Sequence, residues 1–387
     1  MTKLEQLIQE LCPNGVEYKT LGQCTIKTEK IKWSEHQNID FQYIDLTSVD
    51  RVKHVIVETQ KINSNNAPSR AQQIVEYKDI LFGTTRPTLM RYCCIPERFD
   101  NQICSTGFCV LRANNKIVMN KWIYHNISSS KFYTYVECTQ KGASYPAISD
   151  KEVKQFKIPV PPLEVQAEIV RILDKFTELT TELTTELTAR RKQYEYYRNT
   201  SLSFNNKRMV SGQLEYKKLC DREIFDFHYG KGNRIPEESG EINVYGCNGI
   251  VSKTNVWNCE NVAVIGHIGS AGIVNWAEGK SFVTYNGTIA DVKDETVVEK
   301  KYLYYILCSL NLPDYVKGNQ PFLSVSDFEN IQIPVPPISA QQRIVAILDR
   351  FDKLCNDISE GLPAEIEARQ KQYEYYRDKL LTFTMKE

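Results

Sequence analysis

The sequence predicts an α+β protein in which two mostly β domains are separated by two long helices that pair antiparallel as a coiled coil, with a pseudo-twofold internal repeat. Three observations predict this: a long duplication, a heptad-like apolar stripe in each copy, and short β-type runs between the copies. We place the first β domain at 1–155, with an N-terminal helix at 3–12. One spacer helix then occupies 156–204, the second β domain 205–330, and the second spacer helix 331–387.

The internal duplication is the strongest signal in the chain. FKIPVPPLEVQAEIVRILDKF at 156–176 resembles IQIPVPPISAQQRIVAILDRF at 331–351, and the copies end in ARRKQYEYYR and ARQKQYEYYR. The offset is 175 residues at IPVPP and 179 at QYEYYR, so the second copy is four residues longer internally. A weaker echo lies upstream, in EYKTLG at 17–22 and EYKKLC at 215–220. A repeat of this length predicts two structurally related halves.

Each copy carries apolar residues at steps of three and four, which is typical of a helix that packs against one partner. Paired prolines, at 161–162 and 336–337, precede each stripe and predict a stiff start to the helix. Two such helices in one chain most simply pair with each other, antiparallel. The alternative is that each helix lies separately on its own domain.

Two local sequences bear on the length of these helices. TELT occurs three times in tandem from Thr177 to Thr188. Four residues advance a helix by about 6 Å and turn it by about 400°, so one unit could be added or removed while nearly preserving the apolar face. The second copy contains Pro363, and a proline inside a helix costs ~3 kcal/mol, so we expect a kink or short break there.

The two segments between the helices alternate β-branched and aromatic runs with Asn, Gly and Pro turns, which predicts strands. A helix is expected around 120–138 in the first segment and near 299–310 in the second. LEQLIQEL at 4–11 predicts a short amphipathic helix that Pro13, Asn14 and Gly15 close.

Composition and charge narrow the class of protein. The 387 residues are 25% charged, with 48 basic and 48 acidic side chains, and no run of 18 apolar residues occurs. MTKLEQLIQE carries charges where a signal peptide needs an apolar core, so we expect a cytoplasmic protein.

The twelve cysteines form no C-x-x-C pair, which favours reduced thiols. Residues 1–155 have a net charge of +4 and residues 205–330 of −3, so the domains are not electrostatic copies.

No motif assembles a catalytic or metal site. G-x-x-x-x-G-K-[ST] is absent from the sequence, which argues against an ATP motor. Gly266, Gly269 and Gly272 follow an expected strand without opening a convincing helix, so they are weak support for a phosphate loop. The five histidines share no metal-ligand spacing.

Polar loops that contain glycine or proline are the remaining candidates for function. Their side chains can grip phosphates and read base edges, and glycine lets backbone amides approach a ligand. Generic surface loops have the same composition, so DNA contact and plain surface polarity both remain open. The candidates are Arg70, Thr85, Arg86, Arg91, Lys141 and Tyr145 in the first domain, and Lys231, Asn233, Arg234, Asn248, His267, Ser270, Asn319 and Gln320 in the second.

Over essentially its whole length the chain resembles the specificity subunit of a type I restriction-modification enzyme. The most specific motifs are the IPVPP strings followed by ILDKF or ILDRF, and the QYEYYR ends. NAPSRAQ, DILFGTTRP, VYGCNGI, VIGHIGSAG and GNQPFLS match family patterns more loosely. His267 stands where relatives often have arginine, which weakens its case for contact.

This resemblance implies a non-catalytic subunit with two target-recognition domains, each of which reads one half of a split, asymmetric site in double-stranded DNA. It also implies that the helices hold the halves apart and dock two modification subunits, with restriction and motor subunits as further partners. S-adenosylmethionine, ATP and magnesium are expected on those partners, with no cofactor and no membrane contact in this chain. The TELT units resemble a family device that alters half-site spacing.

Aromatic residues near the ends of both repeats are the candidates for partner contact, with packing of the helix pair as their alternative role: Tyr194, Tyr197, Tyr373 and Tyr376. Two other functions remain open. One is a two-headed scaffold that binds proteins and never touches DNA, and the other is a self-sufficient methyltransferase. A DNA footprint in the presence of modification subunits tests the first, and cofactor binding by the purified chain tests the second.

Overall fold

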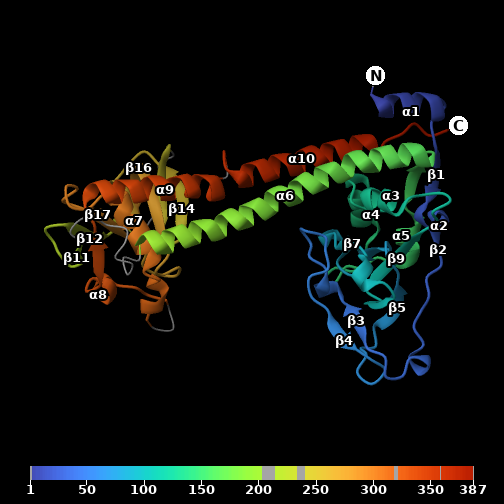
Figure 1. Ribbon diagram of the computed structural model, residues 1–387, viewed down its shortest axis with the longest axis horizontal. Helices are drawn as coiled ribbons and strands as arrows, with labels where there is room; N and C mark the ends of the chain where they lie inside the picture. Colours follow the sequence, from blue (N-terminus) through green and yellow to red (C-terminus); the bar gives the residue numbers. More distant parts are fainter. Residues whose placement is uncertain (1, 203–213, 233–239, 318–320, 358, 387) are drawn as a thin grey trace. The chain divides into compact units, whose positions relative to one another are not determined.

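The computed structural model describes residues 2–202, 214–232, 240–317, 321–357 and 359–386 (Figure 1). The chain forms two compact units. Unit 1 comprises residues 1–182 and 366–387, and unit 2 comprises residues 183–365. Each unit therefore contains one β-rich segment together with parts of both repeated helical regions, whereas the sequence analysis treated each spacer helix as a segment of its own.

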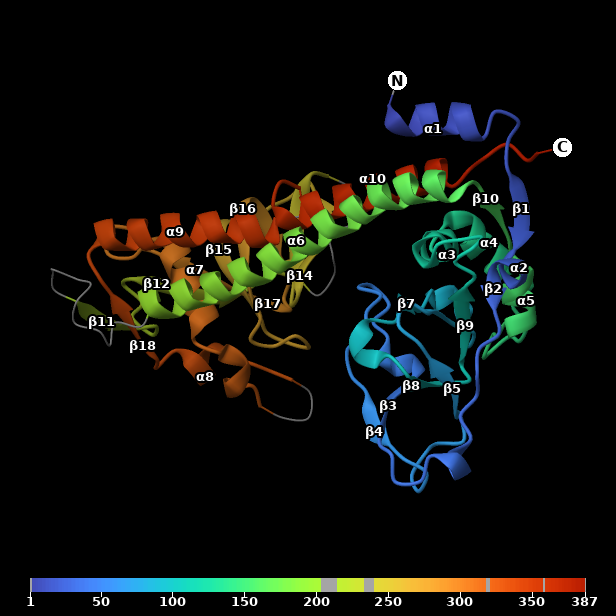
Figure 2. The ribbon, with the colours of Figure 1, turned by 45° about the vertical axis from the view of Figure 1, so that its right-hand side comes forward.

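Unit 1 contains two four-stranded sheets and a two-stranded ribbon (Figure 2). The first sheet has the order β4-β3-β8-β5, with β3 at Phe41–Ile44, β4 at Gln60–Ile62, β5 at Ala71–Val75 and β8 at Gln102–Ser105. The second has the order β2-β9-β6-β7, with β2 at Thr25–Ile26, β6 at Ile80–Gly83, β7 at Tyr92–Cys94 and β9 at Phe108–Ala113. The described residues of this β-rich part also form five α-helices: α1 (Lys3–Leu11), α2 (Leu21–Cys24), α3 (Asn120–Ile127), α4 (Ser130–Thr139) and α5 (Asp150–Gln155).

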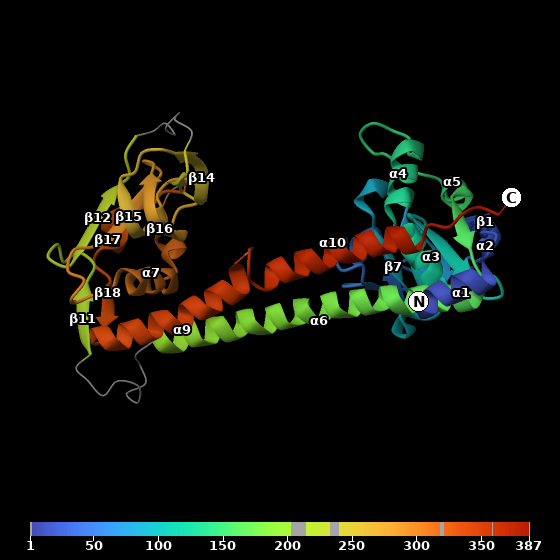
Figure 3. The same ribbon diagram turned by 90° about the horizontal axis from the view of Figure 1, so that it is seen from above.

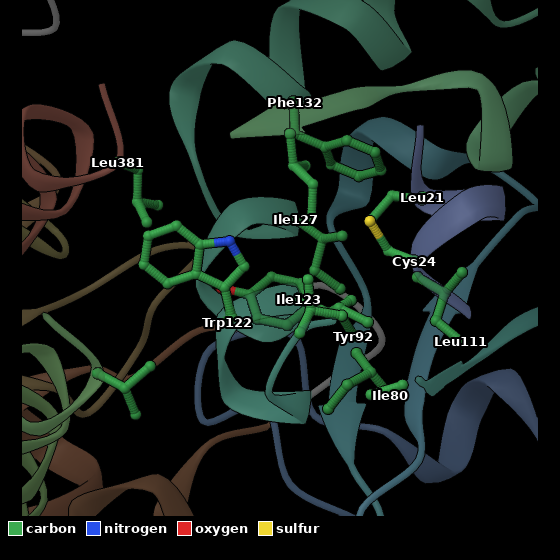
Figure 4. Packing of buried hydrophobic residues seen from close by; sticks show 14 of the residues in the cluster. Leu21, Cys24, Ile80, Tyr92, Leu111, Trp122, Ile123, Ile127, Phe132 and Leu381 are labelled. Atoms are coloured by element: carbon green, nitrogen blue, oxygen red, sulfur yellow. The ribbon is translucent and has the colours of Figure 1, made fainter. Parts of the chain in front are cut away.

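The main core of unit 1 lies between helices α3 and α4 and the β6–β9 pair. Trp122 and Phe132 are fully buried there beside Ile80 and Leu111 (Figure 4). The single helix expected around 120–138 is divided into α3 and α4, because the Ser129 side chain accepts a hydrogen bond from the backbone N–H of Phe132 at 3.3 Å and caps a new helix.

Unit 2 contains a six-stranded sheet in the order β12-β17-β15-β16-β13-β14. Its strands are β12 (Phe225–Tyr229), β13 (Ile242–Gly246), β14 (Gly249–Thr254), β15 (Cys259–Gly266), β16 (Val274–Val283) and β17 (Gly287–Val292). Helix α7 (Lys300–Ser309) agrees with the helix expected near 299–310 and buries Tyr302, Leu303 and Ile306 in the core of this unit. Helix α8 (Val325–Phe328) follows.

The upstream echo in the sequence is explained by a ribbon that both units share. In unit 1, β1 (Glu17–Thr20) pairs antiparallel with β10 (Lys157–Val160). In unit 2, β11 (Glu215–Lys218) pairs with β18 (Gln332–Val335). The register is the same, since Glu17 faces Val160 and Glu215 faces Val335. The EYK and IPV strings are thus two strands of one repeated element.

Three helices form the repeated helical regions: α6 (Leu163–Leu202), α9 (Ile338–Asn356) and α10 (Leu362–Leu380). The 40 residues of α6 give it a length of about 60 Å. The break expected at Pro363 is present, because α9 ends at Asn356 and α10 begins one residue before the proline. Proline is tolerated in this first turn, where its missing N–H is not needed.

These helices pair with one another, as Figure 3 shows. In unit 1, the ring of Phe176 on α6 stacks on that of Tyr376 on α10, with ring centroids 5.5 Å apart. In unit 2, Tyr197 stacks on Phe351 at 5.4 Å, and the Arg191 guanidinium donates to the carbonyl of Cys355 at 3.4 Å. As the chain advances along α6 from Arg191 to Tyr197, the partner on α9 moves back from Cys355 to Phe351, so this pair is antiparallel and the expected pairing is confirmed.

A buried glutamine joins each long helix to its β-rich segment. Gln166 is fully buried; its Oε1 accepts from the N–H of Met119 at 3.0 Å, and its Nε2 donates to the carbonyls of Ile117 at 3.0 Å and Pro161 at 2.8 Å.

Gln341 repeats the arrangement in unit 2. It accepts from the N–H of Glu299 at 2.9 Å and donates to the carbonyls of Val297 and Pro336, each at 2.8 Å. We call these the two glutamine joints.

Aspartates in the ILDKF and ILDRF motifs add an ion pair beside each joint. Asp174 lies 3.2 Å from the Lys121 ammonium in unit 1, and Asp349 lies 3.1 Å from that of Lys301 in unit 2. Both motifs therefore serve to hold a long helix on the helix that covers the sheet.

All twelve cysteines are free, and burial raises the pKa of the Cys24 thiol to about 11. None of the helices within the described ranges combines the length and the apolar character that crossing a membrane requires.

Candidate nucleic-acid interface

Two polar segments that are far apart in the sequence lie side by side in unit 1. The segment from the last residue of β6 to the start of β7, residues 83–91, meets residues 141–149, which precede α5. The N–H of Arg86 donates to the carbonyl of Pro146 at 2.7 Å, and the N–H of Ile148 donates to the carbonyl of Thr84 at 2.9 Å. We call this surface the unit 1 loop pair.

Arg86 and Tyr145 are exposed residues of the unit 1 loop pair whose side chains contact each other. The Arg86 guanidinium lies 4.7 Å from the centroid of the Tyr145 ring, and Tyr145 is 72% exposed. The planar group of an arginine held on an aromatic face keeps its hydrogen-bond donors free for a ligand. The structure therefore brings together two residues that the sequence analysis selected separately.

The other unit 1 candidates occupy less uniform positions. Thr85 is half-buried and forms an isolated β-bridge with Ala147. Arg91 is also half-buried, and its Nε is buried without a hydrogen-bond partner. Arg70 is exposed and lies outside the two segments of the loop pair. Its carbonyl accepts a hydrogen bond from the N–H of Thr106 at 2.9 Å.

Lys141 is exposed but already holds a carboxylate. Its ammonium lies 2.8 Å from Glu152, and this ion pair, together with the N–H of Ser149, lowers the pKa of Glu152 to about 2. A phosphate contact by Lys141 would therefore compete with Glu152.

Unit 2 presents a corresponding pair of segments. The segment that begins at the last residue of β15, residues 266–272, meets residues 321–323. The N–H of Gly269 donates to the carbonyl of Pro321 at 3.2 Å, and the N–H of Leu323 donates to the carbonyl of His267 at 3.0 Å. We call this surface the unit 2 loop pair.

His267 lies beneath the unit 2 loop pair and is 1% exposed, which does not fit the predicted direct contact with DNA. Its Nδ1 lies 2.7 Å from the carbonyl of Leu323 and therefore carries the proton, which leaves Nε2 as an acceptor in the neutral ring. That Nε2 is buried without a partner, and the rings of Tyr229 and Phe322 stand 4.2 and 4.5 Å from the imidazole. The signal that sequence reasoning missed was aromatic: Tyr229, Tyr285 and Phe322 surround this histidine and are each partly exposed.

Of the remaining unit 2 candidates, Lys231 and Asn248 are exposed, with Asn248 in the turn between β13 and β14, and Ser270 is half-buried in the loop pair. Four candidates lie outside the described residues: Asn233, Arg234, Asn319 and Gln320.

The aromatic ends of the helices divide into packing and exposed residues. Tyr373 is 8% exposed, with its hydroxyl 3.1 Å from Nδ1 of His125, and Tyr194 is half-buried near Phe351. These two fit the packing role better than partner contact, whereas Tyr197 and Tyr376 are partly exposed.

Sequence reasoning missed two more exposed tyrosines at these helix ends, Tyr196 at 65% and Tyr375 at 62%. Each packs edge-to-face on its neighbour, Tyr197 or Tyr376, with centroids 5.7 and 5.3 Å apart. The available signal was helical periodicity, because these tyrosines stand one residue away from the apolar stripe.

The part of the chain that the structure describes contains no group of three or more His, Cys, Asp or Glu placed to hold a metal ion. Two β-rich units, each with a loop pair and each attached to a long helix through a buried glutamine, define a duplicated α+β chain. The family model for the type I restriction modification DNA specificity domain matches residues 13–191 and 213–368, so the chain belongs to this family.

Similar proteins carry the same description. A type I restriction enzyme specificity subunit of Haemophilus influenzae is 32% identical over 291 residues, which are 68% of this chain and 72% of that protein. The EcoR124I/EcoR124II specificity subunit of Escherichia coli is 37% identical over 270 residues, 61% of this chain and 65% of the relative. These matches confirm the expected resemblance and the class, a specificity subunit rather than a catalytic one.

Solved structures show the same fold. The S subunit of a type I restriction-modification system from M. genitalium matches with a TM-score of 0.64 at 17% identity, over 95% of this chain and 96% of that one. A chain from a structure of type I restriction-modification complex assembly matches with a TM-score of 0.63 at 24% identity, over 95% of this chain and 98% of that one.

Proposed function

We propose that this chain recognises a bipartite, asymmetric DNA site, and that each unit reads one half of it. The observation that carries this proposal is that both units present a loop pair built on similar backbone hydrogen bonds but with different side chains. Base edges in the major groove are distinguished by the donors, acceptors and apolar groups that face them. Loop pairs of unlike chemistry therefore select unrelated half-sequences.

The candidate contacts are residues of the two loop pairs, together with Arg70, Lys231 and Asn248, which lie outside the loop pairs. In unit 1 they are Arg86 and Tyr145, with Thr85, Arg91, Lys141 and Arg70 as secondary candidates. In unit 2 they are the half-buried Ser270 of the loop pair and the exposed Lys231 and Asn248. Contacts of this kind place the protein on the backbone and read base edges.

We propose that the paired helices set the distance between the half-sites. Threonines of the TELT units support this, because their hydroxyls donate to carbonyls one turn earlier in α6, as Thr181 does to Thr177 at 2.8 Å and Thr188 to Thr184 at 2.9 Å. The hydroxyls of these threonines are thus satisfied within the helix itself.

We further propose that the helices dock two modification subunits. The exposed tyrosine pairs at 196–197 and 375–376 are suited to this role, because a large, partly exposed aromatic surface is typical of a binding hot spot. S-adenosylmethionine then belongs to the modification subunits, and ATP and magnesium to restriction and motor subunits, in the cytoplasm. The residues of this chain supply sequence recognition and positioning.

Methylome sequencing tests this function. A host that carries the chain and its modification partner should show methylated adenines in a split motif with two dissimilar halves, and the motif should vanish when the gene for this chain is removed. Unchanged methylation after removal, or a DNA footprint that is missing when modification subunits are present, would favour the protein-binding scaffold instead.

A further inference from the structure

The loops after β6 and β15 are closed by the same hydrogen bond. In unit 1, the N–H of Gly83 donates to the carbonyl of Arg91 at 2.7 Å. In unit 2, the N–H of Gly266 donates to the carbonyl of Ile273 at 2.7 Å. Gly83 therefore corresponds to Gly266, and the two loops can be aligned from a common start.

The second strand of each loop pair confirms this alignment. The carbonyl one residue after the first glycine, of Thr84 or His267, accepts from Ile148 or Leu323. Two residues further along, the N–H of Arg86 donates to Pro146, and the N–H of Gly269 donates to Pro321. Arg86 of unit 1 thus occupies the position that Gly269 occupies in unit 2.

The backbone at this position favours glycine in both units. Gly269 has a φ of +85°, and Arg86 has a φ of +47°. A residue with a Cβ is disfavoured in this left-handed region, because the Cβ crowds the following carbonyl oxygen. Unit 1 therefore keeps an arginine where its own repeat uses glycine, and strained residues of this kind cluster at functional sites.

The side chain of Arg86 is also held in position by a neighbouring aromatic ring. Tyr145 lies under its guanidinium at 4.7 Å, and the Arg86–Pro146 hydrogen bond ties the two segments together next to that ring. A phosphate contact needs only a positive charge, which a flexible lysine on an unstrained loop supplies. A strained backbone conformation and a stacked aromatic ring are expected instead where the planar guanidinium must be held in one orientation.

Unit 2 has a different surface around the same frame. Gly269 contributes no side chain, and neutral rings of Tyr229, Tyr285 and Phe322 gather around His267 instead. The two loop pairs therefore share a backbone and differ in the group that the backbone presents.

We propose that Arg86 is a specificity-determining residue that reads a guanine in the half-site of unit 1, and that Tyr145 positions the Arg86 side chain. Unit 2, which has Gly269 at the corresponding position, reads its half-site without a side chain there. Guanine is the base that offers two acceptors, O6 and N7, to the fork of an arginine in the major groove. This inference rests on the proposed function, because it assumes that the unit 1 loop pair faces DNA.

The test uses the full chain in complex with its modification subunits and a duplex that carries the site found by methylome sequencing. Each guanine is replaced in turn by 7-deazaguanine, which lacks the N7 acceptor, and affinity is measured by fluorescence anisotropy. The wild-type complex should lose affinity, on the order of 10-fold, at one guanine in one half-site only. Arg86→Gly should bind the unmodified site on the order of 10- to 100-fold more weakly and be insensitive to that same replacement.

Further variants separate positioning from contact. Arg86→Lys keeps the charge but not the fork, so it should be as insensitive to 7-deazaguanine as Arg86→Gly. Tyr145→Ala should weaken binding to the same half-site, and Tyr145→Phe should restore it because the ring is retained. Lys116→Ala, which removes a positive charge from an exposed turn of unit 1, is the matched control and should keep the 7-deazaguanine response.

Folding is controlled by thermal melting. Arg86→Gly should melt no lower than the wild type, because glycine accommodates a positive φ without strain. A half-site without a sensitive guanine, a full 7-deazaguanine response in Arg86→Gly, or equal weakening on all sequences would each overturn the inference. A wild-type complex with no sequence preference would instead contradict the proposed function.

Discussion

The glutamine joints and the loop pairs of the two units differ in what has been kept. Gln166 and Gln341 make the same set of three hydrogen bonds, one to a backbone N–H and two to carbonyls. The loop pairs keep only their backbone hydrogen bonds and exchange Arg86 for Gly269. The glutamine joints therefore determine how each β-rich segment is attached to its helix. The side chains of the loop pairs can differ between the units, and with them what each unit recognises.

The largest expected effect concerns the joints. Replacing Gln166 by Leu should lower the stability of unit 1 by ~3 kcal/mol, because a buried N–H and two carbonyls lose their partner. Gln341→Leu should cost unit 2 about as much. Hydrogen exchange that resolves the two units measures both variants, and a loss below about 1 kcal/mol in either unit would show that the joints are not equivalent.

The next effect concerns the aromatic cluster of unit 2. His267→Phe removes the hydrogen bond to the carbonyl of Leu323 and should loosen residues 321–323, at a cost of ~1 kcal/mol. Methylome sequencing should then show relaxed selection in the half-site that Arg86 variants leave intact. Relaxation of the same half-site by both variants would mean that the two loop pairs do not act separately.

A smaller effect on stability, with a clear effect on recognition, is expected from the TELT units. Deleting one unit shortens α6 by about 6 Å, which corresponds to roughly two base pairs of duplex, while it nearly preserves the apolar face. The methylated motif should keep both half-sequences and lose one or two base pairs from its gap. A changed half-sequence would argue against a spacer role.

The smallest effect is a pH dependence that both units should share. Lys141 lowers the pKa of Glu152 to about 2, and Lys317 does the same for Asp327. A depressed carboxyl pKa stabilises the fold above the unfolded value, near pH 4, and this contribution is lost as the pH falls toward 2. Lys141→Met should flatten this part of the melting profile for unit 1, with Lys317→Met as its counterpart in unit 2.

Periodicity and duplication were sufficient to predict the long helices, their pairing and the break at Pro363, since these features depend on local spacing. They did not predict that IPV and EYK are paired strands, because that pairing joins residues about 140 positions apart in unit 1 and about 117 in unit 2. A single helix was also expected where α3 and α4 are separate, because the apolar pattern did not reveal that the side chain of Ser129 caps α4.

The sequence predicted which kinds of residue form the candidate site, but not how those residues are arranged in space. Arg86 and Tyr145 were selected independently as residues of polar loops, and only the fold shows that residues 83–91 and 141–149 form one surface. The positive φ of Arg86 and the burial of His267 arise from backbone hydrogen bonds between distant segments. A single sequence carries no local signal for such contacts.

The central claim, that each unit reads its own half of a split site, is tested most directly by comparing the methylome of the wild type with that of Arg86→Gly. The account predicts a motif with two dissimilar halves in the wild type, and in the variant a relaxed base at a guanine of one half while the other half and the gap stay the same. A contiguous motif, or a change in both halves at once, would contradict it.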